Sequence, residues 1–292
     1  MNGQAEPLRK KFSKSSPPAP RGINSNIRSL SFTSGKGGVG KTTIVVNLAI
    51  HFAQMGKKVF LVDADLGLAN IDIMLNIAPE YTIEDVLIGK KQINEIIVEG
   101  PLGIHILPSS SGISEMQSLS GQQQMSILKS LGKLQSQYDY ILIDTGAGIA
   151  PNVLRFNAAV DEICVITNTE PTALTDAYAL MKIMSSKYQI HDFSLIVNQA
   201  TPQEANSVYQ RLVNVFDQFL SVTLNFAGNI PRDLNFVKAI KQQTPLSLLL
   251  PKSPSTKAFR NIAQQLVAHA GQPDPINDVP SFWNRLGSWK RK

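Results

Sequence analysis

The chain has 292 residues, of which 43% are hydrophobic and 17% charged, the composition of a globular protein with a sizeable core. Cys164 is the single cysteine, so we expect no disulfides, no cysteine-ligated zinc and no catalytic thiol. No apolar run reaches the length of about 18 residues that a membrane span needs, and the N-terminus lacks the apolar core of a signal peptide. We therefore expect one α/β domain with tails, located in the cytoplasm.

The formal net charge of +6 comes from the two ends of the chain. Residues 9–28 contain six lysines and arginines and no acid, and the last eight residues contain four more cations. The part between them is close to neutral. Basic tails favour contact with anionic surfaces, whereas a neutral domain disfavours a nucleic-acid groove, so we expect no sequence-specific nucleic-acid binding.

In chain order, the first feature is a segment rich in Ser, Pro, Lys and Asn, which predicts a disordered basic arm over 1–26. The run 27–33 then alternates Ile, Leu and Phe with Ser and Thr, as a strand does. After a glycine-rich loop, apolar residues recur at helical spacing over 41–55. The folded part of the chain is therefore predicted to begin with a strand, a loop and a helix.

The glycine-rich loop satisfies the pattern G-x-x-x-x-G-K-[ST], starting at Gly35, in the strand-loop-helix context that the pattern requires. Its glycines let backbone N–H groups close around phosphate oxygens, and the helix N-terminus adds positive potential. Lys41 is then expected on the β- and γ-phosphates and the Thr42 hydroxyl on Mg²⁺. The residues expected to contact the nucleotide here are Gly35, Lys36, Gly37, Gly38, Val39, Gly40, Lys41, Thr42 and Thr43.

Two aspartates end apolar runs that predict strands. Asp63 ends the run 58–63, and Asp144 ends the run 140–144. If these strands are parallel neighbours, both carboxylates point toward the phosphate loop, where they can hold Mg²⁺ directly or through water. An Asp after a strand can also simply start a turn. The nearby loop favours a metal site built from Thr42, Asp63 and Asp144.

Along the rest of the chain, apolar strands alternate with amphipathic helices. Several of the strands are apolar throughout, as a sheet covered on both faces requires. This pattern predicts a doubly wound, mostly parallel sheet with helices on both faces and ligands at the carboxyl ends of the strands. The further strands are predicted at 104–108, 162–167, 193–198 and 224–230, and the further helices at 121–137, 172–188, 203–220, 233–242 and 255–269.

The domain is predicted to span 27–270, and the Pro- and Asn-containing segment 271–280 predicts a linker. The final segment 281–292 places apolar residues at helical spacing among four cations and contains both tryptophans of the chain. A lipid interface suits such a segment, and the alternative is a helix docked on its own domain. The residues predicted to contact the membrane are Phe282, Trp283, Leu286 and Trp289.

Lys36 completes the sequence K-G-G-V-G-K-T-T, which resembles the deviant Walker A signature of the MinD/ParA family of ATPases. The resemblance implies an ATP-dependent dimer in which Lys36 reaches the phosphates bound by the partner subunit. Asp65 stands in a D-x-D pattern similar to the switch I of the family, where the second Asp orients the attacking water. By the same resemblance, residues 144–148 form the Walker B and switch II segment. The implied catalytic residues are Lys36, Lys41 and Asp65, and the implied cofactors are ATP and Mg²⁺.

The resemblance also assigns an adenine site. Asn198, at the end of a predicted strand, and the run 231–233, after the last predicted strand, occupy the positions that frame adenine in this family. Gln199 follows Asn198 where many relatives carry a basic residue, so any charge contributed there is absent from this chain. The residues implied to contact adenine are Asn198, Pro231 and Asp233.

Two longer stretches, 63–75 and 170–182, resemble the FlhG branch of the family, which controls flagellar number. Residues 4–9 (QAEPLR) resemble the D-Q-A-x-x-L-R element with which FlhG proteins stimulate the GTPase FlhF, although Gly3 replaces the Asp. The resemblance implies a switch that controls flagellar number or placement and attaches reversibly to the inner face of the membrane. Its implied partners are an FlhF-type GTPase, flagellar C-ring proteins and a flagellar transcription activator.

Three other functions fit parts of this pattern. A division-site or cargo-positioning ATPase uses the same loop, but ParA-like partitioning needs non-specific DNA binding, which the near-neutral domain does not favour. The iron-sulfur branch needs cysteine pairs, which Cys164 alone does not supply. A non-catalytic adaptor that binds nucleotide would differ mainly in its turnover, and the sequence leaves it open.

Overall fold

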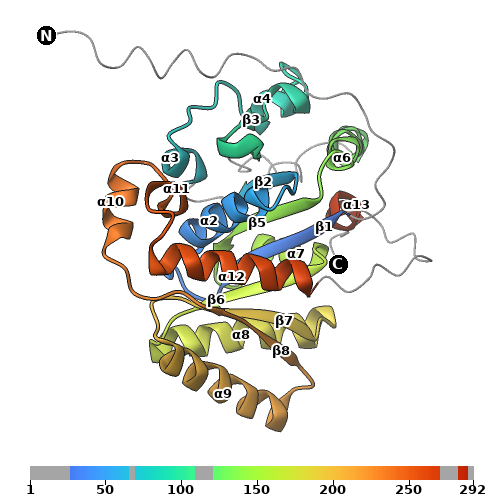
Figure 1. Ribbon diagram of the computed structural model, residues 1–292. Coiled ribbons are helices and arrows are strands. Elements are labelled where there is room, and N and C mark those ends of the chain that lie inside the picture. Colours follow the sequence, from blue (N-terminus) through green and yellow to red (C-terminus); the bar gives the residue numbers. More distant parts are fainter. Residues whose placement is uncertain (1–26, 66–69, 109–120, 270–281, 289–292) are drawn as a thin grey trace, which may run out of the picture.

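The fold is built around one eight-stranded sheet, seen in a computed structural model of the chain (Figure 1). The structure describes residues 27–65, 70–108, 121–269 and 282–288. The strand order is β3-β4-β2-β5-β1-β6-β7-β8, in which β3 is antiparallel to β4 and all other pairs are parallel. The strands are β1 (Arg28–Ser34), β2 (Val59–Ala64), β3 (Val98–Glu99), β4 (His105–Leu107), β5 (Tyr140–Ala147), β6 (Glu162–Thr167), β7 (Asp192–Val197) and β8 (Thr223–Asn229).

Helices cover both faces of this sheet (Figure 1), so the predicted doubly wound architecture is confirmed. The predicted helices are all present with ends shifted by one or two residues. The nine-residue helix α7, three helices of four or five residues and the edge strand β3 were not predicted, and the shortest of these segments carry too little periodicity to be recognised. The helices are α2 (Lys41–Gln54), α3 (Ile71–Leu75), α4 (Ile83–Leu87), α6 (Gly121–Gln135), α7 (Pro151–Ala159), α8 (Pro171–Tyr188), α9 (Pro202–Phe219), α10 (Asn235–Lys241), α11 (Leu246–Leu249), α12 (Pro254–Ala268) and α13 (Phe282–Ser288), with 3-10 turns at Ile93–Glu95 and Pro101–Gly103.

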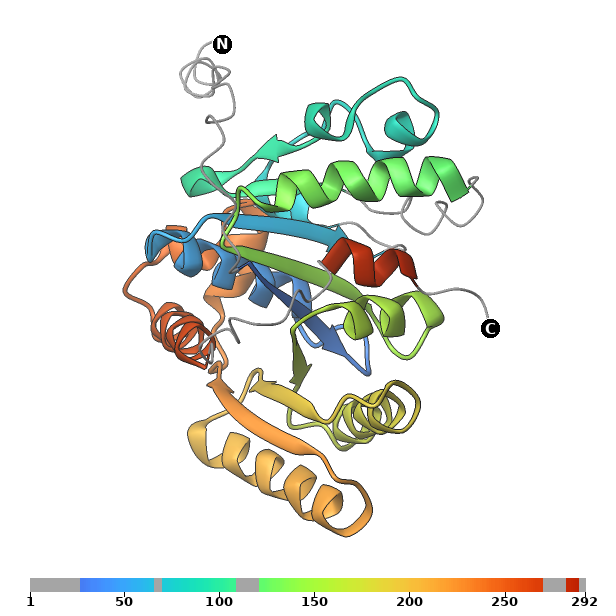
Figure 2. The same cartoon turned by 90° about the vertical axis from the view of Figure 1, so that its right-hand side faces the viewer.

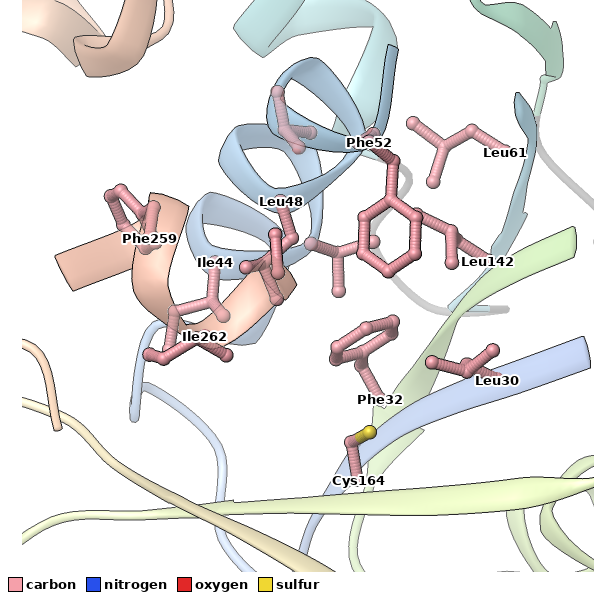
Figure 3. Close-up of a cluster of buried hydrophobic side chains, with 14 of the residues drawn as sticks. Leu30, Phe32, Ile44, Leu48, Phe52, Leu61, Leu142, Cys164, Phe259 and Ile262 are labelled. Atoms are coloured by element: carbon pink, nitrogen blue, oxygen red, sulfur yellow. The ribbon is translucent and has the colours of Figure 1, made fainter. Parts of the chain in front are cut away.

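The core on one face of the sheet holds the phosphate-loop helix in place. Leu30 and Phe32 of β1 are fully buried beneath Leu48 and Phe52 of α2, and α12 adds Ile262 (Figure 3). Successive strand residues point to opposite faces, so β5 contributes to this core and to the one on the opposite face alike. Burial on both sides explains why these strands are almost continuously apolar.

The other face is covered by two further groups of helices. α8 and α9 pack on β6, β7 and β8, while α6 and α7 pack on β2 and β5. Between α6 and α7 lies the C-terminal helix α13 (Figure 2). The chain therefore returns, at its end, to the middle of the sheet.

The docked position of α13 differs from the predicted lipid contact. Phe282 is 3% exposed and Trp283 is fully buried, and Leu286 packs against the same apolar cluster. Arg285 fixes the helix, because its Nε donates to the Ala159 carbonyl at 2.6 Å and its Nη2 pairs with Asp161 at 2.6 Å. The docked alternative thus describes this structure, since α6 and α7 offer the apolar stripe a site on its own domain.

Several predicted segments lie outside the described residues: the arm 1–26, the linker 271–280 and Trp289. None of the helices that the structure describes is long and apolar enough to cross a membrane.

Candidate nucleotide site

The phosphate loop connects β1 to α2 at the carboxyl end of the central strand. Gly40, directly before α2, has a φ of 90° and a ψ of 23°, in the left-handed region that favours glycine. A Cβ added there would also lie 2.6 Å from the Asn198 Nδ2. Conformation and space both require glycine at this position, so the loop is open to backbone contact with a phosphate.

The start of the loop packs directly on helix α8. A Cβ on Gly35 would lie 2.1 Å from the backbone carbon of Asp176, a distance that real atoms do not tolerate. Gly35 is thus required by its contact with a helix more than 130 residues later in the chain. A shift of α8 would therefore displace the start of the phosphate loop.

Asn198 supports the loop from the opposite side. Its Nδ2 donates to the Val39 carbonyl at 2.8 Å, and its Oδ1 accepts from the backbone of Gln199 at 2.9 Å. Arg232 donates through Nε to the Gln199 carbonyl at 3.0 Å, which brings the 231–233 segment to the same place. Asp233 has one buried carboxylate oxygen, Oδ2, without a partner among the described residues. The residues predicted to frame adenine therefore lie together beside the loop, and a free acceptor is available to an amino group.

Asp63 and Asp144 are direct neighbours in the sheet, as predicted, because β2 and β5 pair in parallel with these two residues in register. Both are almost fully buried. Burial first, and the charge of Asp144 second, raise the pKa of Asp63 to about 7. Burial also raises the pKa of Asp144 to about 6, although Lys41 and Thr42 act in the opposite direction. Ionising two neighbouring buried carboxylates is unfavourable, so a cation bound between or beside them is favoured.

The two carboxylates have different surroundings. Asp63 already accepts backbone hydrogen bonds from Asp65 at 3.2 Å, Asn70 at 3.2 Å and Ile71 at 3.3 Å, so it holds the described residues on both sides of 66–69, in the segment predicted to be switch I. Asp144 has a buried Oδ1 without a partner among the described residues. The free oxygen of Asp144, next to Thr42, fits a direct or water-mediated Mg²⁺ ligand, and Asp63 fits a position behind it.

The described residues contain no cluster of three or more His, Cys, Asp or Glu side chains that could hold a metal by themselves. A Mg²⁺ ion at Thr42 and Asp144 would therefore take most of its ligands from phosphate oxygens and water, as this ion commonly does.

Asp65, predicted to orient the attacking water, lies close to Gly146 in the 144–148 segment that is predicted to be switch II. A Cβ on Gly146 would be 3.6 Å from the Asp65 Oδ1, and the charge of Asp65 contributes to the raised pKa of Asp144. The resemblance to the family predicted that Asp65 and residues 144–148 lie together, and in the structure they are close in space. Residues 66–69, between them and α3, lie outside the described residues.

Lys36 points away from its own loop. Its Nζ bonds to Glu170 Oε2 at 2.7 Å and to Thr172 Oγ1 at 3.1 Å, at the start of α8. The side chains of the pair are 40% and 55% exposed, respectively. Lys41, by contrast, is buried within the site. Glu170 and Thr172 were not predicted as site residues, because no local pattern connects them with a lysine 134 positions earlier.

Comparisons with known proteins agree with this geometry. A family model described as an AAA domain matches residues 27–195. The antiactivator FleN of Pseudomonas aeruginosa is 36% identical over 261 residues, covering 89% of this chain and 93% of FleN. The flagellum site-determining protein YlxH of Helicobacter pylori is 32% identical over 291 residues, covering 98% of each chain.

Solved structures show the same fold. A chain of the MinC:MinD cell division complex of Aquifex aeolicus matches with a TM-score of 0.68 and 26% identity, covering 82% of this chain and 96% of that one. MinD of Pyrococcus horikoshii, complexed with Mg-ADP, matches with a TM-score of 0.65 and 26% identity, covering 84% and 98%.

A parallel sheet whose first strand leads through a glycine-rich loop into a helix defines a P-loop nucleotide-binding protein. With these relatives, the chain belongs to the MinD/ParA family of P-loop ATPases, with FleN and YlxH among its relatives. It is therefore an ATPase, and the loop between β1 and α2 is the predicted place of the nucleotide.

Proposed function

We propose that this ATPase is a dimeric switch that controls the number or placement of flagella. The observation that carries the dimer is the position of Lys36, whose exposed ammonium group leaves its own loop and lies at the rim of the site. In this structure the ammonium group pairs with Glu170, and we infer that in the dimer it leaves Glu170 for the phosphates bound by the second copy.

The chemistry of the switch is hydrolysis of ATP to ADP and phosphate. Lys41 and the loop amides would hold the phosphates, Thr42 and Asp144 would hold Mg²⁺, and this ion would supply charge neutralisation. Asp65 accepts a hydrogen bond from the water that attacks the γ-phosphorus, while the bond to the β,γ-bridging oxygen breaks. Lys36 of the second copy stabilises the charge that develops on the transferred group.

Reversible membrane attachment requires α13 to leave the domain. The indole Nε1 of Trp283 in this helix is buried and has no hydrogen-bond partner among the described residues. This missing hydrogen bond weakens the docked state of α13 by about 1–3 kcal/mol. Release would present Phe282, Trp283 and Leu286 together with basic residues to the inner face of the cell membrane. Two copies in a dimer would raise the avidity of a segment that binds weakly alone.

The flagellar role comes from the relatives. FleN is named an antiactivator and YlxH a flagellum site-determining protein. By analogy, the partners of this chain are an FlhF-type GTPase, acting through residues 4–9, flagellar C-ring proteins and a flagellar transcription activator. The second candidate is a division-site ATPase, favoured by the likeness to MinD structures.

Three variants test the switch. Lys41→Ala should abolish nucleotide binding, because it removes the charge buried in the loop. Lys36→Ala should keep binding but lose dimerisation and slow hydrolysis on the order of 100-fold. Asp65→Ala should give a dimer locked with ATP. Equilibrium binding of ATP, sedimentation with ATP and Mg²⁺ and phosphate release together measure all three, and a wild-type protein that stays monomeric would refute the proposal.

Deleting the gene in its host separates the two candidate roles. A flagellar switch predicts a changed number or position of flagella per cell with normal division, and a division-site ATPase predicts misplaced septa with normal flagella. Flotation with anionic liposomes tests the attachment, which should require both ATP and residues 281–292.

A further inference from the structure

Helix α10 carries an apolar stripe that nothing in the described part of the chain covers. Leu234, directly before the helix, is 91% exposed, Val237 is 57% exposed and Ile240 is 53% exposed. They stand three residues apart and so occupy one side of the helix. We call these three residues the α10 face.

The opposite side of α10 already has its partners. Phe236 packs edge-on against Phe259 of α12, with ring centroids 6.1 Å apart, and Ala239 is buried. Lys238 and Lys241 flank the stripe on the outer side, and neither forms an ion pair with any residue that the structure describes. The α10 face therefore makes no contribution to the core formed by the described residues, and exposed apolar stripes of this kind commonly mark a contact surface.

The α10 face is continuous with the rim of the nucleotide site. The segment leading into the helix is held by the Arg232 contact with Gln199, next to the Asn198 contact with the phosphate loop. On its other end α10 lies against α11, which packs on the phosphate-loop helix α2 (Figure 1). These contacts place α10 beside the nucleotide site, so we expect a body that closes over that site to reach α10 as well.

We propose that the α10 face is buried by a second copy of this chain when two copies close over bound ATP. This inference rests on the dimeric switch proposed above and adds a surface to it. Three aliphatic side chains offer on the order of 300 Å², well below the roughly 800 Å² per partner of a stable interface. The α10 face alone is too small to hold a dimer, so its burial depends on the nucleotide rim and is driven by ATP.

The composition of the face favours a protein partner over a lipid surface. Its exposed apolar residues are all aliphatic, and the one aromatic residue of α10, Phe236, points into the core. Segments that lie in a membrane interface commonly place Trp or Tyr at that level, as the 281–292 segment of this chain does.

The test is the double variant Val237→Ser/Ile240→Ser in the full chain. Both side chains are exposed and lie outside the predicted nucleotide contacts, so the monomer should keep its fold and its affinity for ATP. Sedimentation with Mg²⁺ and a non-hydrolysable ATP analogue should show a dimer dissociation constant raised at least about tenfold. Ile88→Ser is the matched control, because Ile88 is 75% exposed on a different part of the surface and should leave the dimer unchanged.

A second measurement does not depend on the stability of the double variant. Cys164 is the single cysteine and is buried, so Val237→Cys introduces the single accessible thiol. Its reaction with a maleimide should be fast with ADP and at least about tenfold slower with the ATP analogue at concentrations where the wild type is dimeric. The same thiol at position 88 should react equally fast in both states.

The outcomes separate this inference from the dimeric switch itself. If the wild type dimerises and the double variant dimerises equally well, the inference fails and the switch stands. If the wild type stays monomeric, the switch fails and the inference with it. If the double variant still dimerises but no longer floats with liposomes, the face binds lipid and the inference is wrong.

Discussion

Helices α13 and α10 are both seven residues long and both carry an apolar stripe beside basic residues, yet they have opposite fates. The stripe of α13 is buried between α6 and α7, whereas the stripe of α10 is exposed. The difference lies in what their own domain offers. The cluster under α13 has room for an additional helix, while α10 already fills its core contact with Phe236 on the opposite side. An amphipathic pattern thus shows that a helix needs a partner, but not which one.

The largest expected effect tests the buried member of this pair. Trp283→Ala removes a fully buried ring and should lower the free energy of unfolding by about 3 kcal/mol, because the free-energy cost of the cavity adds to that of the lost apolar contact. Urea unfolding measures this loss. Trp283→Phe is the control, which keeps most of the packing and removes the unpaired Nε1. Unfolding unchanged by Trp283→Ala would mean that α13 is not docked in solution.

A second experiment concerns the support under α10. His51 of α2 is buried and shares a hydrogen bond of 3.1 Å with Ser247 of α11, the helix on which α10 rests. Burial first, and the charge of Arg260 second, lower the pKa of His51 to about 4. The unfolded chain takes up a proton below pH 6.5 while the folded chain does not, so stability is lost as the pH falls from about 6.5 to 4.

The expected loss over that range is about 3 kcal/mol, from the size of the pKa shift. It is measured as the difference in unfolding free energy between the wild type and His51→Gln, which does not titrate. The two curves should converge as the pH falls, and parallel curves would show that His51 is not buried in solution.

The nucleotide site and α13 differ in how much of their structure could be predicted from the sequence. The phosphate loop was predicted residue by residue because its pattern is contiguous, and the pairing of Asp63 with Asp144 followed from two strands that end alike. The bond between Lys36 and Glu170 was not predicted, because it joins residues 134 positions apart without a shared pattern. The sequence left two alternatives for α13, docking on its own domain and contact with lipid, because the outcome depends on the space between α6 and α7.

A smaller effect is expected at the polar anchor of α13. Arg285→Ala removes the bonds to the Ala159 carbonyl and to Asp161, which should cost about 1–2 kcal/mol because the pair is largely shielded from solvent. Arg285→Lys keeps the charge but not the two-donor geometry and should recover only part of this loss. Urea unfolding at two salt concentrations measures both variants. Equal stability of Arg285→Ala and the wild type would assign the docking to the apolar stripe alone.

The smallest effect tests the exposed member of the pair. Val237→Ser/Ile240→Ser should change the free energy of unfolding of the monomer by less than about 0.5 kcal/mol, because neither side chain loses a buried contact. Thermal unfolding with ADP measures this change in monomer stability. The same experiment with the ATP analogue should show the wild type stabilised more than the variant, since dimer formation adds to stability by mass action. A loss of more than 1 kcal/mol in the ADP state would place the α10 face in the fold of the single chain, as α13 is. The contrast between the two helices would then disappear, because both stripes would be satisfied within one copy.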